Sequence, residues 1–299
     1  MTLRVAVTGG SGRIGSAVIR ALLARGHQAV NLDIRHPAKS ACRHVFADLT
    51  RREQVQPALE GMDAVCHLGE IPNLGNLAPE HVYAHNTAAG AVVMQCTADL
   101  GIPRLIYASS IQVYGMSFPH YLSPAQLPCD ESHPLRPQQG YALSKVANEL
   151  YAQVLTANAK GSISTAIFRL PWVCEYELSA SVDSEHWTWL TPRLSRMEEI
   201  GAYVHVGDAA EAICLAVELP RAGCEVYQIS ADEGLFARPV RAWMQEAFPT
   251  LPALPADWPD YRSPYLSDKF RSHFPWTPRW NLLDLHRTRY GAPPAARAR

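Results

Sequence analysis

The most constraining feature of this sequence is a glycine-rich turn near its N-terminus. The segment TGGSGRIG, residues 8–15, places Gly9, Gly12 and Gly15 at three-residue spacing, after an apolar run and before a helical pattern. In that context the glycines permit a tight turn, close approach of the backbone to a pyrophosphate and close packing of helix on strand. Free N–H groups at the helix start favour an anion there. The turn therefore predicts a dinucleotide site, to which we also assign Arg13 and Ile14.

The first half of the chain alternates short apolar runs with helical patterns. The strand-like runs are Leu3–Thr8, Ala29–Asp33, His44–Ala47, Ala64–His67, Leu105–Ala108 and Ser164–Arg169. The helical stretches between them are Ile14–Arg25, Val55–Glu60, Glu80–Leu100 and Tyr141–Ala157. Strands separated by crossover helices predict an α/β fold with a doubly wound parallel sheet of the Rossmann type. Ligands of such sheets bind at the carboxyl ends of the strands.

The pattern changes after Arg169. We expect residues 1–170 to form the dinucleotide-binding domain and residues 171–299 to form a small substrate-binding cap, with strand segments near 203–206 and 225–230 returning to the sheet. Residues 249–280 are rich in proline and aromatic residues, which predicts an irregular cap rather than regular layers. The active site would be the cleft between the two parts.

Composition narrows the class of protein further. The formal net charge of −1 gives no field that would attract nucleic acid or anionic lipid. The seven cysteines form no CxxC pair, which suits a reducing compartment and argues against a zinc site or a disulfide framework. The histidines show no metal-binding spacing, so we expect no metal. No apolar run reaches the length of a membrane span and no leader pattern is evident, so we expect a cytoplasmic protein.

The identity of the dinucleotide depends on the end of the second strand. Asp33 lies 18 residues after Gly15, where a carboxylate accepts both ribose hydroxyls and repels a 2′-phosphate. This favours NAD. Arg35 and Arg13 leave NADP as the less favoured alternative, because arginine can hold a 2′-phosphate. We assign Asp33, Ile34 and Arg35 to this end of the cofactor site.

The segments YALSK and YASSIQVYG carry the candidate chemistry. Tyr141 and Lys145 are four residues apart, so they share one face of a helix. A nearby cation stabilises a phenolate and lowers the pKa of a tyrosine, which makes Tyr141 a candidate general acid and base. Ser110, at a strand end, could hydrogen-bond the reacting oxygen. Taken singly, the first pair could be an exposed helix face, and Ser109 and Ser110 could be strand-end caps.

Together these residues resemble the extended short-chain dehydrogenases/reductases, also called NAD-dependent epimerases/dehydratases. The similarity extends almost from end to end. The matching segments are TGGSGRIG, Asp33, ADLT (47–50), HLG (67–69), Asn86, SSIQVYG (109–115), DESHPLRP (130–137), YALSK, FRLPWV (168–173), YVHVGDAAEA (203–212) and LSDKF (266–270). These motifs are specific for fold and cofactor and much less so for substrate.

The resemblance implies roles for individual residues. Ser110, rather than Ser109, would hold the catalytic serine position, Tyr141 would transfer the proton, and Lys145 would bind the nicotinamide ribose and tune Tyr141. Further cofactor contacts are implied for Asp48, Leu49, Leu68, Gly69, Asn86 and Leu170.

The chain departs from the family pattern where substrates are selected. Ile111 and Gln112 stand where the dehydratases place Asp-Glu, so sugar dehydration is not expected. Gly201 stands where members that bind nucleotide sugars place an arginine, and only 35 residues separate Arg169 from His205, which is short for a nucleotide-holding insert. Arg193, Arg196 and Arg262 remain candidate anion binders, with surface charge as the simpler interpretation. The residues that could face substrate are Glu70, Ile111, Gln112 and Trp172.

Three hypotheses follow. The first is an NAD-dependent dehydrogenase acting on a small polyhydroxylated substrate such as a sugar or sugar acid. The second is a nucleotide-sugar epimerase that oxidises its substrate transiently. The third, a non-catalytic dinucleotide-binding regulator, would have no reason to keep serine, tyrosine and lysine in register. A homodimer through the helices Glu80–Leu100 and Tyr141–Ala157 is expected.

Overall fold

The computed structural model describes residues 1–39, 41–72, 77–116, 122–175, 198–234, 239–248 and 250–281. Two of the candidate anion binders, Arg193 and Arg196, lie outside the described residues.

A seven-stranded sheet forms the centre of the molecule, and every pairing in it is parallel. Its order is β3-β2-β1-β4-β5-β6-β9, with β1 at a position from which the chain winds in both directions. The strands are β1 (Arg4–Thr8), β2 (Gln28–Leu32), β3 (Arg43–Val45), β4 (Ala64–His67), β5 (Arg104–Ser110), β6 (Ser164–Leu170) and β9 (Gly223–Gln228). The predicted doubly wound parallel α/β sheet is confirmed.

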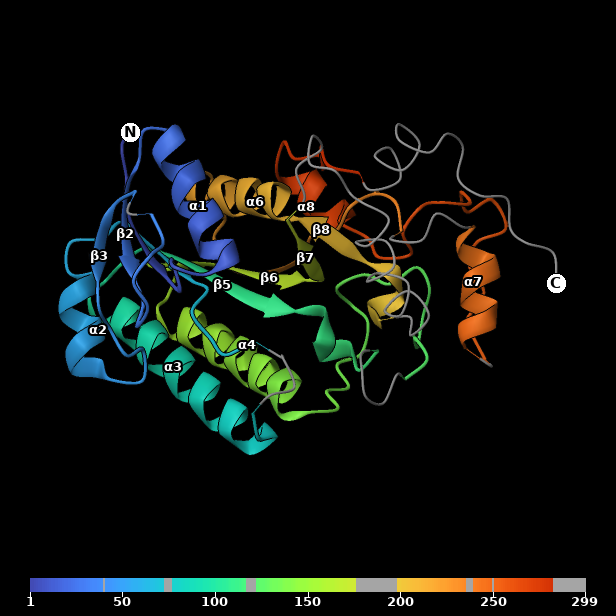
Figure 1. Cartoon of the computed structure of the whole chain (residues 1–299), viewed down its shortest axis with the longest axis horizontal. Coiled ribbons are helices and arrows are strands. Elements are labelled where there is room, and N and C mark those ends of the chain that lie inside the picture. The colour runs from blue at the N-terminus through green and yellow to red at the C-terminus, as the bar shows by residue number, and fades with distance from the viewer. Residues whose placement is uncertain are drawn as a thin grey trace.

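Helices cover both faces of this sheet. The helices are α1 (Arg13–Ala24), α2 (Arg52–Leu59), α3 (Pro79–Asp99), α4 (Gly140–Asn158), α6 (Val206–Glu218), α7 (Val240–Ala247) and α8 (Asp268–His273), with short 3₁₀ turns η1 (Ile111–Tyr114) and η2 (Glu198–Gly201). Figure 1 shows α1, α6 and α8 on one face of the sheet and α2, α3 and α4 on the other. The buried apolar residues divide accordingly, because one cluster joins the sheet to the first set and a second cluster joins it to the other.

A third apolar cluster lies beyond the carboxyl ends of the strands. It joins η1 to α7, with Val113, Tyr114, Trp243 and Met244 among its buried members. In Figure 1, α7 stands apart from the sheet on the side toward which β5 points. This cluster attaches the C-terminal segments to the end of the sheet where ligands of such folds bind.

The C-terminal part differs from the expectation in two respects. The segment near 225–230 does return to the sheet as β9, but Tyr203–His205 does not. It forms β8, which pairs with β7 (Trp172–Cys174) in a separate two-stranded sheet. The proline-rich stretch also contains a regular element, the helix α8. Its Phe270 packs into the same core as α1 and α6.

Candidate active site

The carboxyl ends of three neighbouring strands bring polar side chains together. Thr8 of β1 is in register with His67 of β4, which is in register with Tyr107 of β5. All three are fully buried. Glu70 follows β4 at the same edge, so the sheet delivers a row of polar groups next to the glycine turn.

The glycine turn lies very close to neighbouring backbone segments. Gly9 has a φ of 67°, and a Cβ on it would lie 2.6 Å from Gly69 Cα. A Cβ on Gly15 would lie 2.3 Å from Gly9 O, because α1 starts directly against the turn. Gly12 differs, since a Cβ there would meet only Gly9 O at 3.1 Å and the Arg35 Nη2 atom at 3.6 Å.

These surroundings fit a dinucleotide. Gly12 is the N-cap of α1 and provides no side-chain cap, and the first turn of the helix contains no acidic residue. Its free backbone N–H groups and the positive end of the helix dipole therefore suit a pyrophosphate. Gly12 is the glycine whose open side leaves room for that group.

Asp33 lies just beyond β2 and is 6% exposed. Its Oδ2 accepts the Ser11 N–H at 3.0 Å and its Oδ1 accepts the Arg35 N–H at 2.9 Å. The Arg35 side chain is 69% exposed, and its Nε lies 3.8 Å from Asp33 Oδ1. The carboxylate predicted to accept a ribose and the arginine that could hold a 2′-phosphate are thus neighbours. Ile34 between them is exposed.

The segments after β3 and β4 form the next part of the predicted cofactor site. The N–H groups of Leu68 and Gly69 both donate to Thr8 Oγ1 at 3.1 Å, which fixes them against the glycine turn. Leu49 is buried against Gly69. Hydrogen bonds from the Thr50 hydroxyl and N–H lower the pKa of Asp48. Leu49, Leu68 and Gly69 therefore lie together beside the glycine turn.

Four other predicted cofactor residues have contacts of different kinds. The fully buried Asn86 accepts the Ile71 N–H at 2.8 Å and donates to Ile71 O at 2.9 Å, so its side chain holds the loop after β4. Arg13 donates to Val173 O at 3.0 Å, linking α1 to β7. Ile14 and Leu170 pack in the apolar core that α1 shares with the sheet.

The predicted catalytic residues come from β5 and α4. Lys145 is 5% exposed, and its Nζ lies 5.4 Å from the centre of the Tyr141 ring. The same Nζ donates to Ala108 O at 2.5 Å, which fastens α4 to β5 two residues before Ser110. Ser110 caps η1, and its Oγ accepts the Gln112 N–H at 3.2 Å. The expected i, i+4 placement of the ammonium beside the phenol ring is present.

The two adjacent serines have different environments. Ser109 Oγ donates to Glu149 Oε1 at 2.5 Å, and Glu149 also receives the Arg169 guanidinium, with Nη2 to Oε2 at 2.7 Å. Ser109 therefore belongs to a buried network that joins β5, α4 and β6. This leaves Ser110 as the serine at the strand end.

Glu70 forms a buried ion pair with Lys145. Lys145 Nζ lies 2.5 Å from Glu70 Oε2, and the two side chains are 6% and 4% exposed. Glu70 Oε1 accepts hydrogen bonds from the Tyr107 hydroxyl at 3.1 Å and from Asn148 Nδ2 at 2.8 Å. Burial alone would raise the pKa of Glu70, but the Lys145 ammonium and His67 outweigh burial and lower it to about 2. Glu70, expected to face substrate, contacts Lys145, the predicted catalytic lysine.

The remaining candidate substrate residues differ in how buried they are and in what they contact. Ile111 is 2% exposed and packs in the apolar cluster that holds α7, so it fills a core instead of lining an open site. Gln112 Oε1 accepts a hydrogen bond from Gln139 Nε2 at 2.8 Å, which links η1 to the start of α4. Trp172 lies half-buried on β7, paired in register with Tyr203. Arg262 stacks on Trp258, with 4.7 Å from its Cζ to the ring centre.

Sequence reasoning missed the residues that are linked to Lys145 through Glu70. Thr8, His67 and Tyr107 meet through strand register, which a single sequence does not reveal. Asn148 carried a usable signal, because it lies three residues after Lys145 and shares its helix face.

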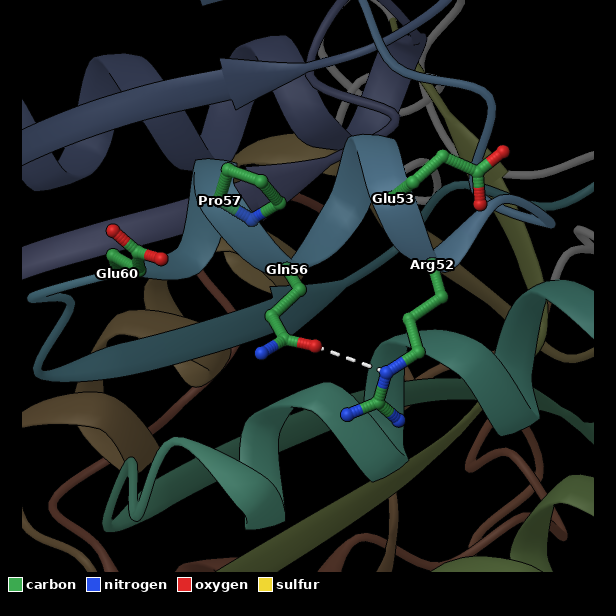
Figure 2. Close-up of a pocket in the computed structure, with 5 residues that line it drawn as sticks. All are labelled: Arg52, Glu53, Gln56, Pro57 and Glu60. Atoms are coloured by element: carbon green, nitrogen blue, oxygen red, sulfur yellow. Dashed lines mark hydrogen bonds between the residues drawn. The ribbon is translucent and has the colours of Figure 1, made fainter.

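Two other kinds of site are a metal centre and a membrane-spanning segment. Within the described parts of the chain, no group of three histidine, cysteine or acidic side chains could hold a metal ion, and no helix is long and apolar enough to cross a membrane. A surface pocket on α2, shown in Figure 2, contains none of the predicted site residues. It is lined by Arg52, Glu53, Gln56, Pro57 and Glu60.

The chain is similar to several known proteins. The chain is 28% identical over 244 residues to an L-arabinose 1-dehydrogenase (NAD(P)(+)) of Haloferax volcanii, covering 77% of this chain and 89% of that protein. It is 29% identical over 179 residues to UDP-glucose 4-epimerase 4 of rice, covering 53% of this chain and only 47% of that protein. Among solved structures, an Agrobacterium tumefaciens short-chain dehydrogenase/reductase superfamily protein with bound NAD superposes with a TM-score of 0.71. That match has 22% identity and covers 97% of this chain and 96% of the other.

The family model matches the part of the chain that contains the sheet, the candidate cofactor-binding residues and the candidate catalytic residues. It extends over residues 5–230, from β1 through the end of β9, and so includes the glycine turn, Ser110, Tyr141 and Lys145. The chain belongs to the NAD dependent epimerase/dehydratase family.

Proposed function

We propose that this protein is an NAD-dependent oxidoreductase that transfers hydride between nicotinamide and a carbinol or carbonyl carbon of a small polyhydroxylated substrate, a sugar or sugar acid. The observation that carries the proposal is the buried Lys145 ammonium beside the Tyr141 ring, fastened to β5 next to Ser110. A non-catalytic regulator would have no use for this arrangement.

NAD, when bound, supplies the hydride acceptor. Tyr141 takes the proton from the substrate hydroxyl, and the Lys145 ammonium favours the phenolate form that can do so. The Ser110 hydroxyl accepts the Gln112 N–H, so that contact leaves its own proton for the reacting oxygen. Desolvation of Lys145 strengthens its electrostatic effect on Tyr141.

Different residues of the chain would bind different parts of NAD. The α1 N-terminus at Gly12 receives the pyrophosphate, Asp33 receives the adenosine ribose, and Lys145 receives the nicotinamide ribose. Leu49, Leu68 and Gly69, which lie beside the glycine turn, would contact the dinucleotide between them. Arg35, exposed beside Asp33, leaves NADP as a weaker alternative.

Two observations bear on the substrate. Gly201 offers no charge for a nucleotide diphosphate, and the Haloferax sugar dehydrogenase is matched over most of its length. Both favour a small substrate. The second candidate, a nucleotide-sugar epimerase, is favoured by the similarity to UDP-glucose 4-epimerases.

A direct assay separates the two. Purified protein is mixed with NAD and a panel of sugars and sugar acids, and NADH is followed by its absorbance. The proposal expects NADH with at least one of them. Conversion of a UDP-sugar without net NADH, together with no NADH from the panel, would replace the first function with the second.

The proposal also includes a homodimeric assembly and a cytoplasmic location. The apolar residues Leu143, Leu150 and Val154 are exposed along α4, which packs beside α3, and they support a homodimer through these helices. All seven cysteines lie in the described part of the chain and none forms a disulfide, which supports a reducing, cytoplasmic environment.

A further inference from the structure

The contact between Glu70 and Lys145 is not used by the proposed reaction. The ammonium has three N–H groups, and two oxygens, Glu70 Oε2 and Ala108 O, each lie 2.5 Å from Nζ. Lys145 is therefore held from β5 and from the loop after β4 at once. One N–H direction remains for the cofactor ribose.

The surroundings of Glu70 keep it ionised. Tyr107 and Asn148 donate to its Oε1, and both of its oxygens are buried. Thr8 Oγ1 accepts two N–H groups, so its own proton is directed to His67 Nδ1 at 2.8 Å. His67 then presents Nε2–H toward Glu70 Oε1, 3.5 Å away. Each neighbouring donor thus favours the carboxylate form.

The charged and titratable groups that face the pair come from three elements. His67 belongs to β4, Tyr107 to β5, and Tyr141 to α4. Glu149 of α4 also acts on Lys145, but it is itself paired with Arg169. Within this set, Glu70 is the carboxylate in direct contact with the ammonium.

We propose that Glu70 is a positioning residue, which pins the Lys145 ammonium and offsets its charge, so that the Tyr141–Lys145 pair releases its proton at higher pH than it would alone. This inference rests on the roles that the proposed function gives to Tyr141 and Lys145.

The direction follows from counting charges. With Glu70 ionised, the protonated Tyr141–Lys145 pair and its carboxylate sum to zero, and loss of one proton leaves a buried net charge of about −1. Without the carboxylate, the same step takes the cluster from a net positive charge to neutrality. Removing the carboxylate therefore lowers the pH of proton release, whichever of the two groups loses the proton.

The test is Glu70→Gln, followed by two pH titrations. The first records the ultraviolet absorbance of phenolate, with Tyr141→Phe in each background as the subtraction. The second records kcat/KM at saturating NAD. We expect the onset of both to move down by about one pH unit or more. An unchanged or higher onset in a folded Glu70→Gln protein would overturn the proposal.

Two further variants keep the result interpretable. Glu70→Asp retains the charge at a greater distance from Nζ, and we expect a smaller shift in the same direction. If Glu70→Gln does not fold, an unchanged onset in Glu70→Asp overturns the proposal. The control is Asp208→Asn, which alters a carboxylate 3% exposed that accepts the Arg279 and Trp280 N–H groups. It should lower thermal stability and leave the onset unchanged, and an equal shift in the control would also overturn the proposal.

The two proposals fail separately. If the wild-type protein forms no NADH with any substrate, the proposed function fails, but the phenolate titration still measures the effect of Glu70. If NADH forms and the phenolate onset does not respond to Glu70→Gln, only the inference about Glu70 fails.

Discussion

Gly12 and Gly15 lie in one turn but have different neighbours. A Cβ on Gly15 would overlap the backbone of Gly9 and Gly10, at 2.3 Å and 2.7 Å. A Cβ on Gly12 would meet no backbone atom closer than 3.1 Å. Gly15 is thus required by the protein's own packing, whereas packing does not require Gly12, which is left to the proposed pyrophosphate site.

A glycine-to-alanine substitution should therefore have different effects at Gly15 and at Gly12. Gly15→Ala should lower the free energy of unfolding by about 1–3 kcal/mol, because it forces the helix away from the turn. Gly12→Ala should change it by less than about 1 kcal/mol and raise the Kd for NAD at least about tenfold, or about 1.4 kcal/mol. Denaturant unfolding and calorimetric titration measure both quantities. Equal loss of stability in the two variants would contradict this division of roles.

Asp33 and Arg35 give a second prediction at this scale. Asp33→Asn keeps the shape of the side chain and removes the charge that repels a 2′-phosphate, so the ratio of NADP to NAD affinity should rise about tenfold or more. Adding Arg35→Ala should cancel the gain in NADP affinity, because it removes the guanidinium beside Asp33. A ratio that does not respond to Asp33→Asn would exclude Asp33 as the determinant.

At the scale of elements, the hydrophobic pattern predicted most of the first half of the chain. The predicted helix Tyr141–Ala157 is α4 within one residue at each end, and Glu80–Leu100 is α3 within one residue. Both are long stretches without a proline in their interior, and they pack against each other, so local sequence and tertiary packing agree. The short strand β8 was assigned to the wrong sheet, because pairing partners depend on tertiary contacts that periodicity does not encode.

The residues of the candidate site could be predicted where they belong to short sequence motifs. They could not be predicted where they come together only through contacts between different strands and helices. Ser110, Tyr141 and Lys145 follow from two short segments. Glu70 was expected to face substrate because it follows a strand end, and its burial against Lys145 depends on how α4 packs on β5 beside the loop after β4. Ile111 was likewise assigned from its position after Ser110, while η1 turns its side chain into the core.

The network of Glu149 supports a prediction about the junction of elements. Glu149 and Arg169 are 1% and 5% exposed, and they join α4 to β6. Glu149→Gln leaves the Arg169 charge buried with a weaker partner, so the free energy of unfolding should fall by about 3–5 kcal/mol. Glu218→Gln is the control, because its pair with Arg25 is about one-quarter exposed, and the loss there should be about 1 kcal/mol or less. Similar losses in the two variants would contradict the assignment.

At the scale of the whole molecule, the side that carries α3 and α4 exposes apolar surface. Leu143, Leu150 and Val154 are 46%, 54% and 61% exposed, and they repeat along one face of α4. Figure 1 shows α3 and α4 side by side on the outer side of the sheet. Helices with such a face pack well against a second copy through a two-fold axis.

The wild-type protein should therefore be a dimer in solution. Val154→Lys should shift it toward the monomer at micromolar concentration, because it places a charge in the apolar interface. Leu219→Lys should not, although Leu219 is 50% exposed, because it lies at the end of α6 on the other face of the sheet. Analytical ultracentrifugation measures the outcome, and a monomeric wild-type protein would refute the interface.

The central claim is that Tyr141, with Lys145 beside it, performs proton transfer for NAD-dependent hydride chemistry. The most direct test measures turnover and NAD affinity on one preparation of Tyr141→Phe. We expect kcat with an active sugar substrate to fall by about 10² to 10⁴-fold, and the Kd for NAD to stay within about threefold, or about 0.7 kcal/mol. Turnover that survives the loss of this hydroxyl, with NAD still bound, would contradict the account.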